Sequence, residues 1–192
     1  VMSSGQYDLS TTYDKIFREE GENSKESVFE VQATASAQTQ TANGVQYAQI
    51  MGVRGAGSWD IGWGWNTPST NLEAAYEPND PRKNRTILYL STTTTTNLSI
   101  YGEVMPVYTS PTGSPPNPRY NNKVYSNPAI RASVGHRFGY WMNIRLLRYA
   151  DVVLMYAEAA NEVGGATNIT AARTGLNSVR ARARSGAPAG TL

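Results

Sequence analysis

Hydrophobic residues are most concentrated between residues 143 and 162, and from Tyr149 to Ala160 they leave almost no polar face. This pattern predicts a long helix over residues 143–162 that is buried. Its charged residues recur at spacings of three, four or seven, so they lie on one side of the helix and need charged partners. They are Arg145, Arg148, Asp151, Glu158 and Glu162.

A second helix is predicted after Gly164 and Gly165, with Thr170 as its N-terminal cap. Its apolar face consists of Ala172, Leu176, Val179 and Ala183, flanked by Arg173, Arg180 and Arg184. The two segments therefore predict an antiparallel helix pair in which alanines permit close approach and arginines meet carboxylates. The charges assigned to this pairing are Arg148, Asp151, Glu158 and Arg180. If Glu158 lies in a buried pair, its replacement by alanine destabilises the fold.

Short elements are predicted elsewhere. Residues 13–21 suggest a helix ended by Gly21, residues 70–76 a second helix, and residues 28–32, 45–53 and 86–90 three strands. On the first strand, Phe29 and Val31 share one face. The proline, serine and asparagine residues between Ser110 and Pro128 predict a long loop. The fold class is thus mainly α, with long ordered loops and a few short strands, in a single domain over residues 1–192.

Composition narrows the possible functions. The chain has 192 residues, 40% of them hydrophobic, and a formal net charge of +2, which gives no strong field for nucleic acid. The absence of cysteine excludes disulfides and thiolate chemistry. No apolar stretch reaches the roughly 20 residues that span a bilayer, and the N-terminus does not resemble a signal peptide.

No motif indicates catalysis, a metal or a cofactor. The only histidine, His136, has no serine and carboxylate arrangement around it, and we expect it to be structural. The carboxylates Asp60, Glu73, Glu77 and Asp80 could supply the acid and base of a glycosidase, but helix ends and salt bridges explain them more simply. One histidine and no cysteine leave only oxygen ligands for a metal, without EF-hand spacing. The glycines of residues 52–57 and 62–64 fit tight turns beside indoles, not a phosphate loop.

The segment 57–66 carries the clearest candidate for binding chemistry, because it holds three of the four tryptophans on a glycine-rich backbone. Indole faces stack on the C–H faces of sugars while polar side chains bind the hydroxyls, so Trp59 with Asp60 and Arg54 can form a glycan platform. Trp63 and Trp65 belong to the same candidate surface. The alternative is structural: large aromatics usually bury, and these two indoles would then anchor the loop to the core.

Other aromatic residues offer a weaker candidate surface. Tyr101, Tyr108, Tyr120 and Tyr125 lie in or near the long loop, where they either contact a ligand or pack over the helices. Trp141, ahead of the long helix, is expected to fill the core.

Several segments resemble signatures of the SusD/RagB family, and they occur in the family's order. Leu147–Ala159 reads LRYADVVLMYAEA and Leu176–Ala183 reads LNSVRARA, while NSKESVFEV at 23–31, GWGWNTPS at 62–69 and NDPR at 79–82 match further family landmarks. The chain lacks a counterpart of the family's N-terminal half, with its lipidated cysteine and tetratricopeptide-like helices, and of the segment that follows residue 192. We therefore expect an excised C-terminal portion.

The resemblance implies a SusD-like α-α superhelix and a protein that binds nutrient without transforming it. Family members are lipid-anchored at the outer face of the outer membrane, so membrane attachment would come from sequence outside this chain. The implied ligand is a glycan, oligosaccharide or peptide nutrient, and the implied partner is a SusC-like TonB-dependent transporter. Two alternatives stay open: an interaction scaffold of the RagB type that binds protein or peptide, and a glycoside-acting enzyme. No cofactor is implied.

Overall fold

The computed structural model describes residues 1–36, 45–55, 59–93, 99–110 and 117–185. The chain divides into two compact units, which we describe separately. Unit 1 comprises Val1–Val31, Asn79–Pro81 and Arg145–Leu192, and unit 2 comprises Gln32–Pro78 and Arg82–Ile144. The prediction of a single domain stays a prediction. No helix in the described ranges is long and apolar enough to cross a membrane.

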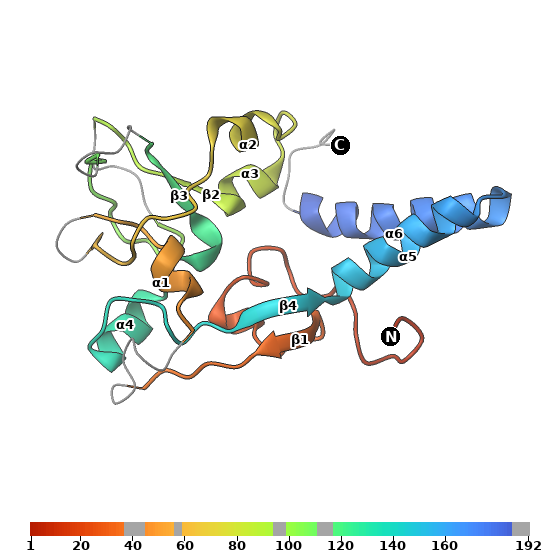
Figure 1. Cartoon of the computed structure of the whole chain (residues 1–192), viewed down its shortest axis with the longest axis horizontal. Coiled ribbons are helices and arrows are strands. Elements are labelled where there is room, and N and C mark those ends of the chain that lie inside the picture. Colours follow the sequence, from red (N-terminus) through yellow and green to blue (C-terminus); the bar gives the residue numbers. More distant parts are fainter. Residues whose placement is uncertain (37–44, 56–58, 94–98, 111–116, 186–192) are drawn as a thin grey trace. The chain divides into compact units, whose positions relative to one another are not determined.

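Unit 1 combines a two-stranded sheet with a helix pair. Strand β1 (Ser27–Val31) pairs with β4 (Ile144–Arg148), and β4 leads directly into α5 (Tyr149–Val163), which lies beside α6 (Ala166–Arg184) (Figure 1). The 3₁₀ turn η1 (Glu19–Gly21) stands where the sequence predicted a longer helix. On β1 the predicted face of Phe29 and Val31 is exposed, while Glu30 is buried.

The helix pair packs through small residues, as predicted. Ala157 and Ala160 of α5 meet Ala172 of α6 in a buried cluster. A Cβ atom on Gly175 would lie 3.3 Å from the Cβ of Ala157, so glycine allows the two helices to approach closely here. The outer side of α5 is exposed, which contradicts the expectation that the helix is buried all round. Its exposed apolar side chains are Leu154, Met155, Tyr156 and Val163.

Both helices begin elsewhere than predicted. Residues 144–148 form a strand, because they pair with β1 and because the carboxylate of Asp151 accepts the backbone N–H of Arg148 at 3.0 Å, which caps α5 at that point. Helix α6 begins four residues before Thr170, whose hydroxyl donates to the carbonyl of Ala166 at 2.8 Å. Thr170 is therefore an internal residue of α6, and Gly165 takes the cap position.

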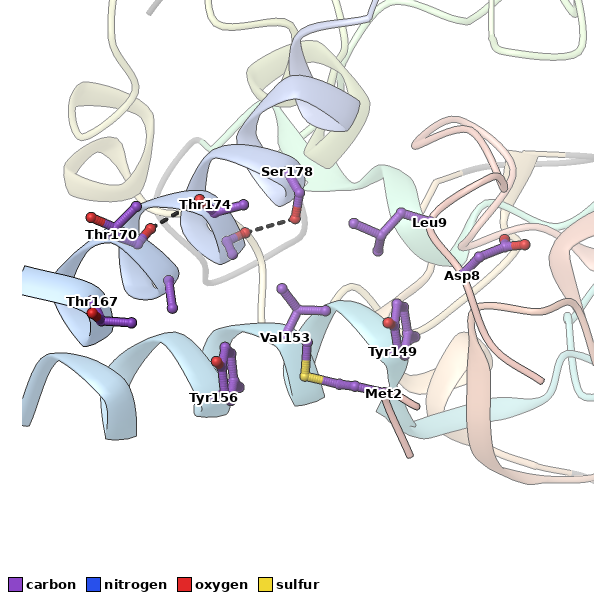
Figure 2. A pocket seen from close by; sticks show the side chains of 12 residues that line it. Met2, Asp8, Leu9, Tyr149, Val153, Tyr156, Thr167, Thr170, Thr174 and Ser178 are labelled. Carbon is purple, nitrogen blue, oxygen red and sulfur yellow. Dashed lines mark hydrogen bonds between the residues drawn. The ribbon is translucent and has the colours of Figure 1, made fainter. Parts of the chain in front are cut away.

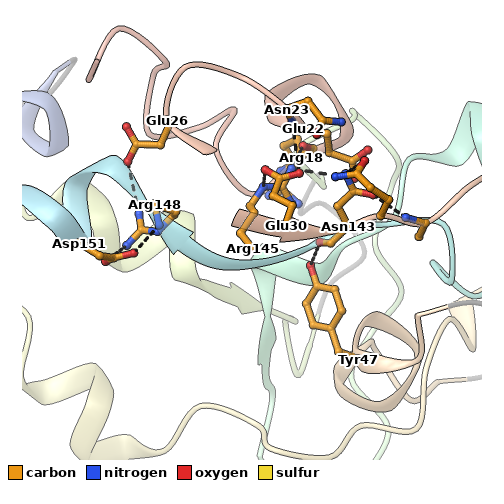
Figure 3. Close-up of polar contacts among 12 residues, drawn as sticks. Arg18, Glu22, Asn23, Glu26, Glu30, Tyr47, Asn143, Arg145, Arg148 and Asp151 are labelled. Carbon is orange, nitrogen blue, oxygen red and sulfur yellow. Dashed lines mark hydrogen bonds and ion pairs between the residues drawn. The ribbon is translucent and has the colours of Figure 1, made fainter. Parts of the chain in front are cut away.

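Buried charges tie the parts of unit 1 together, but they are not the pairs that the sequence predicted (Figure 3). The carboxylate of Glu26, 1% exposed, lies 2.7 Å from the guanidinium of Arg182 and 3.8 Å from that of Arg148. Arg145 lies 3.6 Å from Glu30 across the sheet. The ion pairs of unit 1 thus converge on the segment that contains β1.

The ion pairs predicted between α5 and α6 are not found among the residues that the structure describes. Glu158 is exposed, and neither it nor Arg180 forms an ion pair with any residue that the structure describes. Arg148 does pair with Asp151, at 2.8 Å, but the two residues are three apart at the start of α5 and do not join the helices. Because Glu158 faces solvent, its replacement by alanine leaves no buried charge behind, and we withdraw that prediction.

Unit 2 is built from short elements. Its helices are α1 (Tyr47–Met51), α2 (Thr70–Ala74), α3 (Pro81–Thr86) and α4 (Pro128–Val134), with the 3₁₀ turn η3 (Asn122–Val124). Strands β2 (Ile87–Tyr89) and β3 (Arg119–Asn121) pair antiparallel, with Leu88 opposite Tyr120. One core cluster surrounds Tyr120 and Tyr125, and another contains Trp141, which fills the core as predicted.

Helix α2 and strand β2 confirm their predictions, and the Ser69 hydroxyl caps α2 by accepting the N–H of Leu72 at 3.1 Å. Two other predictions are wrong. Residues 47–51 form helix α1 and not a strand, because Tyr47, Ala48 and Met51 then bury one face against the second cluster. The predicted loop 110–128 contains β3 and η3, apart from residues 111–116, which lie outside the described ranges. The class of the fold is nevertheless mainly helical with few short strands.

Candidate functional site

The tryptophan loop, residues 59–66, is held by its main chain. Trp63 and Trp65 donate their N–H groups to the carbonyls of Gln49 and Ile50, at 2.8 and 3.0 Å. The last carbonyls of a helix have no partner within that helix, so the loop supplies the donors that the end of α1 needs. Two further bonds continue the pattern: Gly64 to Gly52 at 2.9 Å and Ile61 to Val53 at 3.0 Å.

Glycine residues allow the backbone of the tryptophan loop to touch the backbone that follows α1. A Cβ atom on Gly62 would lie 2.4 Å from the Cα of Gly52, and one on Gly52 would lie 2.6 Å from the carbonyl oxygen of Ile61. Both distances are far below van der Waals contact, so the two backbone segments can touch only where both residues are glycine. The expectation that these glycines serve tight backbone geometry beside the indoles is therefore confirmed.

The loop presents Trp63 and Trp65 to solvent. Their side chains are 40% and 61% exposed, and the two ring centroids lie 6.0 Å apart with a tilt of 60°. The expectation that these two indoles anchor the loop to the core is wrong. Main-chain hydrogen bonds attach the loop, and the indole rings stay exposed. We call the surface formed by Trp63 and Trp65 the tryptophan platform.

Trp59 takes the opposite role. Its ring packs against the first core cluster, with its centroid 5.7 Å from that of Tyr125. The neighbouring Asp60 forms an ion pair of 2.9 Å with Arg137. Of the five residues predicted for a glycan surface, Trp63, Trp65 and Arg54 are therefore exposed, whereas Trp59 and Asp60 are committed to contacts within the protein.

Two asparagines that the sequence analysis did not single out meet at Met51, the last residue of α1. The side-chain amides of Asn66 and Asn121 point their nitrogens at the sulfur of Met51, at 3.2 and 3.8 Å. A thioether sulfur is a weak acceptor, so both amides keep donor capacity for a stronger one. Asn66 directly follows Trp65 in the chain, but Asn121 lies on β3, and only the folded chain brings it to Met51.

A polar network fixes the far end of the loop. Asn117 donates to the hydroxyl of Thr67 at 3.0 Å, and Arg119 donates to Glu73 at 2.6 Å. The hydrogen bonds from Arg119 and Tyr89 lower the pKa of Glu73, while burial and the bond to Glu73 raise the pKa of Tyr89 to about 12. Glu73 is therefore a carboxylate and Tyr89 a neutral phenol at neutral pH.

A model of the SusD family matches residues 4–188. The chain belongs to the SusD family. The surface glycan-binding protein A from Bacteroides thetaiotaomicron shares its fold, with a TM-score of 0.65 and 24% identity over 95% of this chain and 40% of that one. The same protein in complex with laminarihexaose gives a TM-score of 0.62 and 23% identity, over the same shares of the two chains.

A laminarin binding SusD-like protein matches with a TM-score of 0.61 and 25% identity, over 94% of this chain and 40% of its own. The chain thus spans about 40% of the length of these SusD-like structures. No curated protein matches it.

Two of the carboxylates considered for glycoside cleavage, Glu73 and Asp60, are already engaged by basic side chains. A glycosidase acid needs a raised pKa, but the pKa of Glu73 is lowered. Asp60 is paired with Arg137, and Glu77 is exposed. Within the described ranges, no group of three or more His, Cys, Asp or Glu side chains could hold a metal ion.

The remaining aromatic candidates serve the fold. Tyr120 and Tyr125 are buried, and Tyr101 and Tyr108 pack against the same cluster, which agrees with the packing alternative. His136 lies against Phe138 and Tyr140, and burial lowers its pKa.

Unit 1 has a groove of its own, with a volume of about 620 Å³, between α5, α6 and the N-terminal segment (Figure 2). Tyr149, Val153 and Tyr156 line it from α5. On α6, the hydroxyls of Thr174 and Ser178 donate to the carbonyls of Thr170 and Gly175, at 2.9 and 2.7 Å. These donors are used within the helix, so the groove offers apolar surface more than hydrogen bonds to a sugar.

Proposed function

We propose that this chain is part of a non-catalytic protein that binds glycan at the cell surface through the tryptophan platform. One observation carries the proposal: two exposed indoles stand side by side on a backbone that hydrogen bonds and glycine contacts hold in place. Exposed tryptophan is unfavourable for solubility and needs a reason, which a ligand that covers it supplies.

The chemistry of the platform suits sugars. A pyranose ring lays its C–H face on an indole, and the tilt between Trp63 and Trp65 favours a chain that curves across both rings. The amides of Asn66 and Asn121, whose nitrogens face only the weak acceptor sulfur of Met51, supply donors for hydroxyl groups of the sugar. Because the loop is already ordered, binding loses little conformational entropy.

The similar solved structures support the ligand class. One is of a surface glycan-binding protein with laminarihexaose, and another is of a laminarin binding protein. We extend the class, a glycan, to this chain and leave the sugar open. In our reading Trp63, Trp65, Asn66 and Asn121 contact the sugar, Arg54 lies beside them, and Trp59 and Asp60 support the loop.

For the whole protein, family membership supports delivery of the glycan to a SusC-like TonB-dependent transporter from a lipid-anchored position on the outer membrane. We further propose that α5 and α6 are one repeat of an α-α superhelix. Leu154 and Met155, which are exposed on α5, form the contact surface that such a repeat offers to neighbouring helices.

The test is isothermal titration of the full-length protein with a panel of polysaccharides, beside Trp63→Ala, Trp65→Ala and the double variant. Each single change is expected to weaken binding about tenfold, which corresponds to roughly 1.4 kcal/mol of lost stacking. Leu72→Ala, an exposed apolar residue on α2, is the matched control and should bind normally.

Undiminished binding by the double variant would place the ligand elsewhere. Binding of peptide without binding of any sugar would favour the interaction-scaffold alternative. Release of reducing ends from a bound polysaccharide would show that the protein is an enzyme.

A further inference from the structure

Arg54 is a cation without a partner beside the tryptophan platform. It is exposed, and its guanidinium forms no ion pair and no hydrogen bond with any residue that the structure describes. The ranges outside that description contain no aspartate or glutamate, so no acidic side chain from them can pair with it either. An exposed, unpaired arginine next to exposed indoles is available to a ligand.

The position of Arg54 relative to the platform is fixed by its backbone. The phenol of Tyr120, a buried residue of β3, donates to the carbonyl of Arg54 at 2.8 Å. A Cβ atom on Gly64 would lie 2.7 Å from the Cβ of Arg54, so the arginine leaves the main chain against the residue that separates Trp63 from Trp65. The tight contact at Gly64 keeps this spacing constant.

Two acidic side chains of unit 2 already have cationic partners. Asp60 pairs with Arg137 at 2.9 Å, and Glu73 is shared between Arg119 at 2.6 Å and Lys83 at 3.3 Å. Neither carboxylate is paired with Arg54, whose positive charge has no acidic partner among the residues that the structure describes. A guanidinium binds a carboxylate or a sulfate through two parallel hydrogen bonds, which a neutral sugar cannot offer.

We infer that the platform selects an acidic glycan, one whose sugar units carry a carboxylate or a sulfate. Arg54 is the residue that binds this acidic group. The inference rests on the proposed function. In the bound state the two indoles stack on sugar faces while Arg54 contacts the acidic substituent of the unit that lies over Gly64. Neutral glycans use the indoles alone and bind more weakly.

The experiment compares the full-length protein with Arg54→Gln in titrations with polygalacturonate, a sulfated galactan and neutral laminarin. Arg54→Gln should lower the affinity for one of the acidic polymers about tenfold and change the affinity for laminarin less than twofold. The acidic polymer that responds identifies carboxylate or sulfate as the recognised group. Arg54→Lys should restore part of the loss, because lysine keeps the charge without the planar fork.

Arg173→Gln is the matched control, since Arg173 is exposed on α6 and lacks an ion pair in the described ranges. It removes the same charge from unit 1 and should leave all three affinities unchanged. Raising the salt concentration should weaken binding of the acidic polymer to wild type and have little effect on laminarin.

Equal losses for acidic and neutral polymers in Arg54→Gln, or preferred binding of laminarin by wild type, would overturn the charge selection and leave glycan binding intact. Failure of every polymer to bind wild type would instead remove the proposed function itself. Thermal unfolding of Arg54→Gln, expected to match wild type because the residue is exposed, separates both results from misfolding.

Discussion

The two units hold their parts together by different means. In unit 1, charged side chains are buried, and Glu26 joins Arg182 of α6 to Arg148 at the end of β4. In unit 2, the tryptophan loop is attached to α1 by main-chain hydrogen bonds and glycine contacts. Side chains used for cohesion are unavailable to ligands, whereas main-chain attachment leaves the indoles of Trp63 and Trp65 free.

The largest effect is expected at Glu26. Glu26→Gln removes a buried negative charge and strands the guanidinium of Arg182, so we expect a loss of about 3–5 kcal/mol in the free energy of unfolding. Urea denaturation measures it. Glu158→Gln, an exposed change on α5, should stay within about 0.5 kcal/mol of wild type. Similar losses for the two variants would show that buried charge does not hold unit 1.

The next effect tests the main-chain attachment of unit 2. Gly62→Ala places a methyl group where only 2.4 Å is available, so the loop must move away from Gly52. We expect roughly 2–3 kcal/mol of lost stability together with lost glycan binding. Trp63→Ala should lose binding at nearly unchanged stability, as measured by thermal unfolding. Normal glycan affinity in Gly62→Ala would mean that the loop need not be fixed.

A third change tests whether the exposed apolar surface of α5 is covered in the full-length protein. Met155→Lys should alter the stability of the 192-residue chain by less than about 0.5 kcal/mol, because the side chain is exposed there. In the full-length protein it should cost about 2 kcal/mol if neighbouring helices cover this side of α5. Asn161→Lys, also exposed on α5, is the control. A small effect of Met155→Lys in both lengths argues against coverage.

The smallest effect is expected for the hydrogen bonds that Glu73 accepts from Tyr89 and Arg119. Hydrogen bonds lower the pKa of Glu73 in the folded protein, so its contribution to stability is complete above its unfolded value near 4.5 and is lost as pH falls through the lowered folded value. Glu73→Gln should therefore be less stable than wild type at pH 6, and the difference should shrink below pH 4. Denaturation at several pH values measures the difference.

Local signals were sufficient to predict some elements. The pattern over residues 70–76 predicted helix α2, and the alanines of α5 and α6 predicted the close helix pair. The family signatures gave the fold to which these elements belong, and the family model confirms them.

Other elements depended on contacts that are remote in the sequence. Residues 144–148 are helix-compatible but form a strand because they pair with β1. Strand β1 lies more than a hundred residues earlier in the chain, so no local pattern indicates this pairing. At α4 the signal was local and was misinterpreted: Asn127 caps the helix and Pro128 occupies its first turn, where proline is favoured. Asparagine and proline are also typical of loops, which is why the sequence pattern predicts a loop through Pro128.

The exposure of the tryptophans was beyond prediction from composition. Trp59 and Trp63 lie four residues apart in one glycine-rich segment, and only the hydrogen bonds to α1 and the contact with Tyr125 decide which ring packs against the core. Arg54 belongs to the candidate surface predicted from the sequence, but its lack of an ion pair with the described residues is visible only in the fold.

The attachment of the tryptophan loop through carbonyl groups has an evolutionary consequence. Mutations at 63 and 65 exchange what the surface displays without touching the bonds that shape it, so recognition can diversify while folding is conserved. Gene duplicates can thus acquire new nutrients by a few codon changes, and a library randomised at these two positions offers a practical route to receptors with altered sugar specificity.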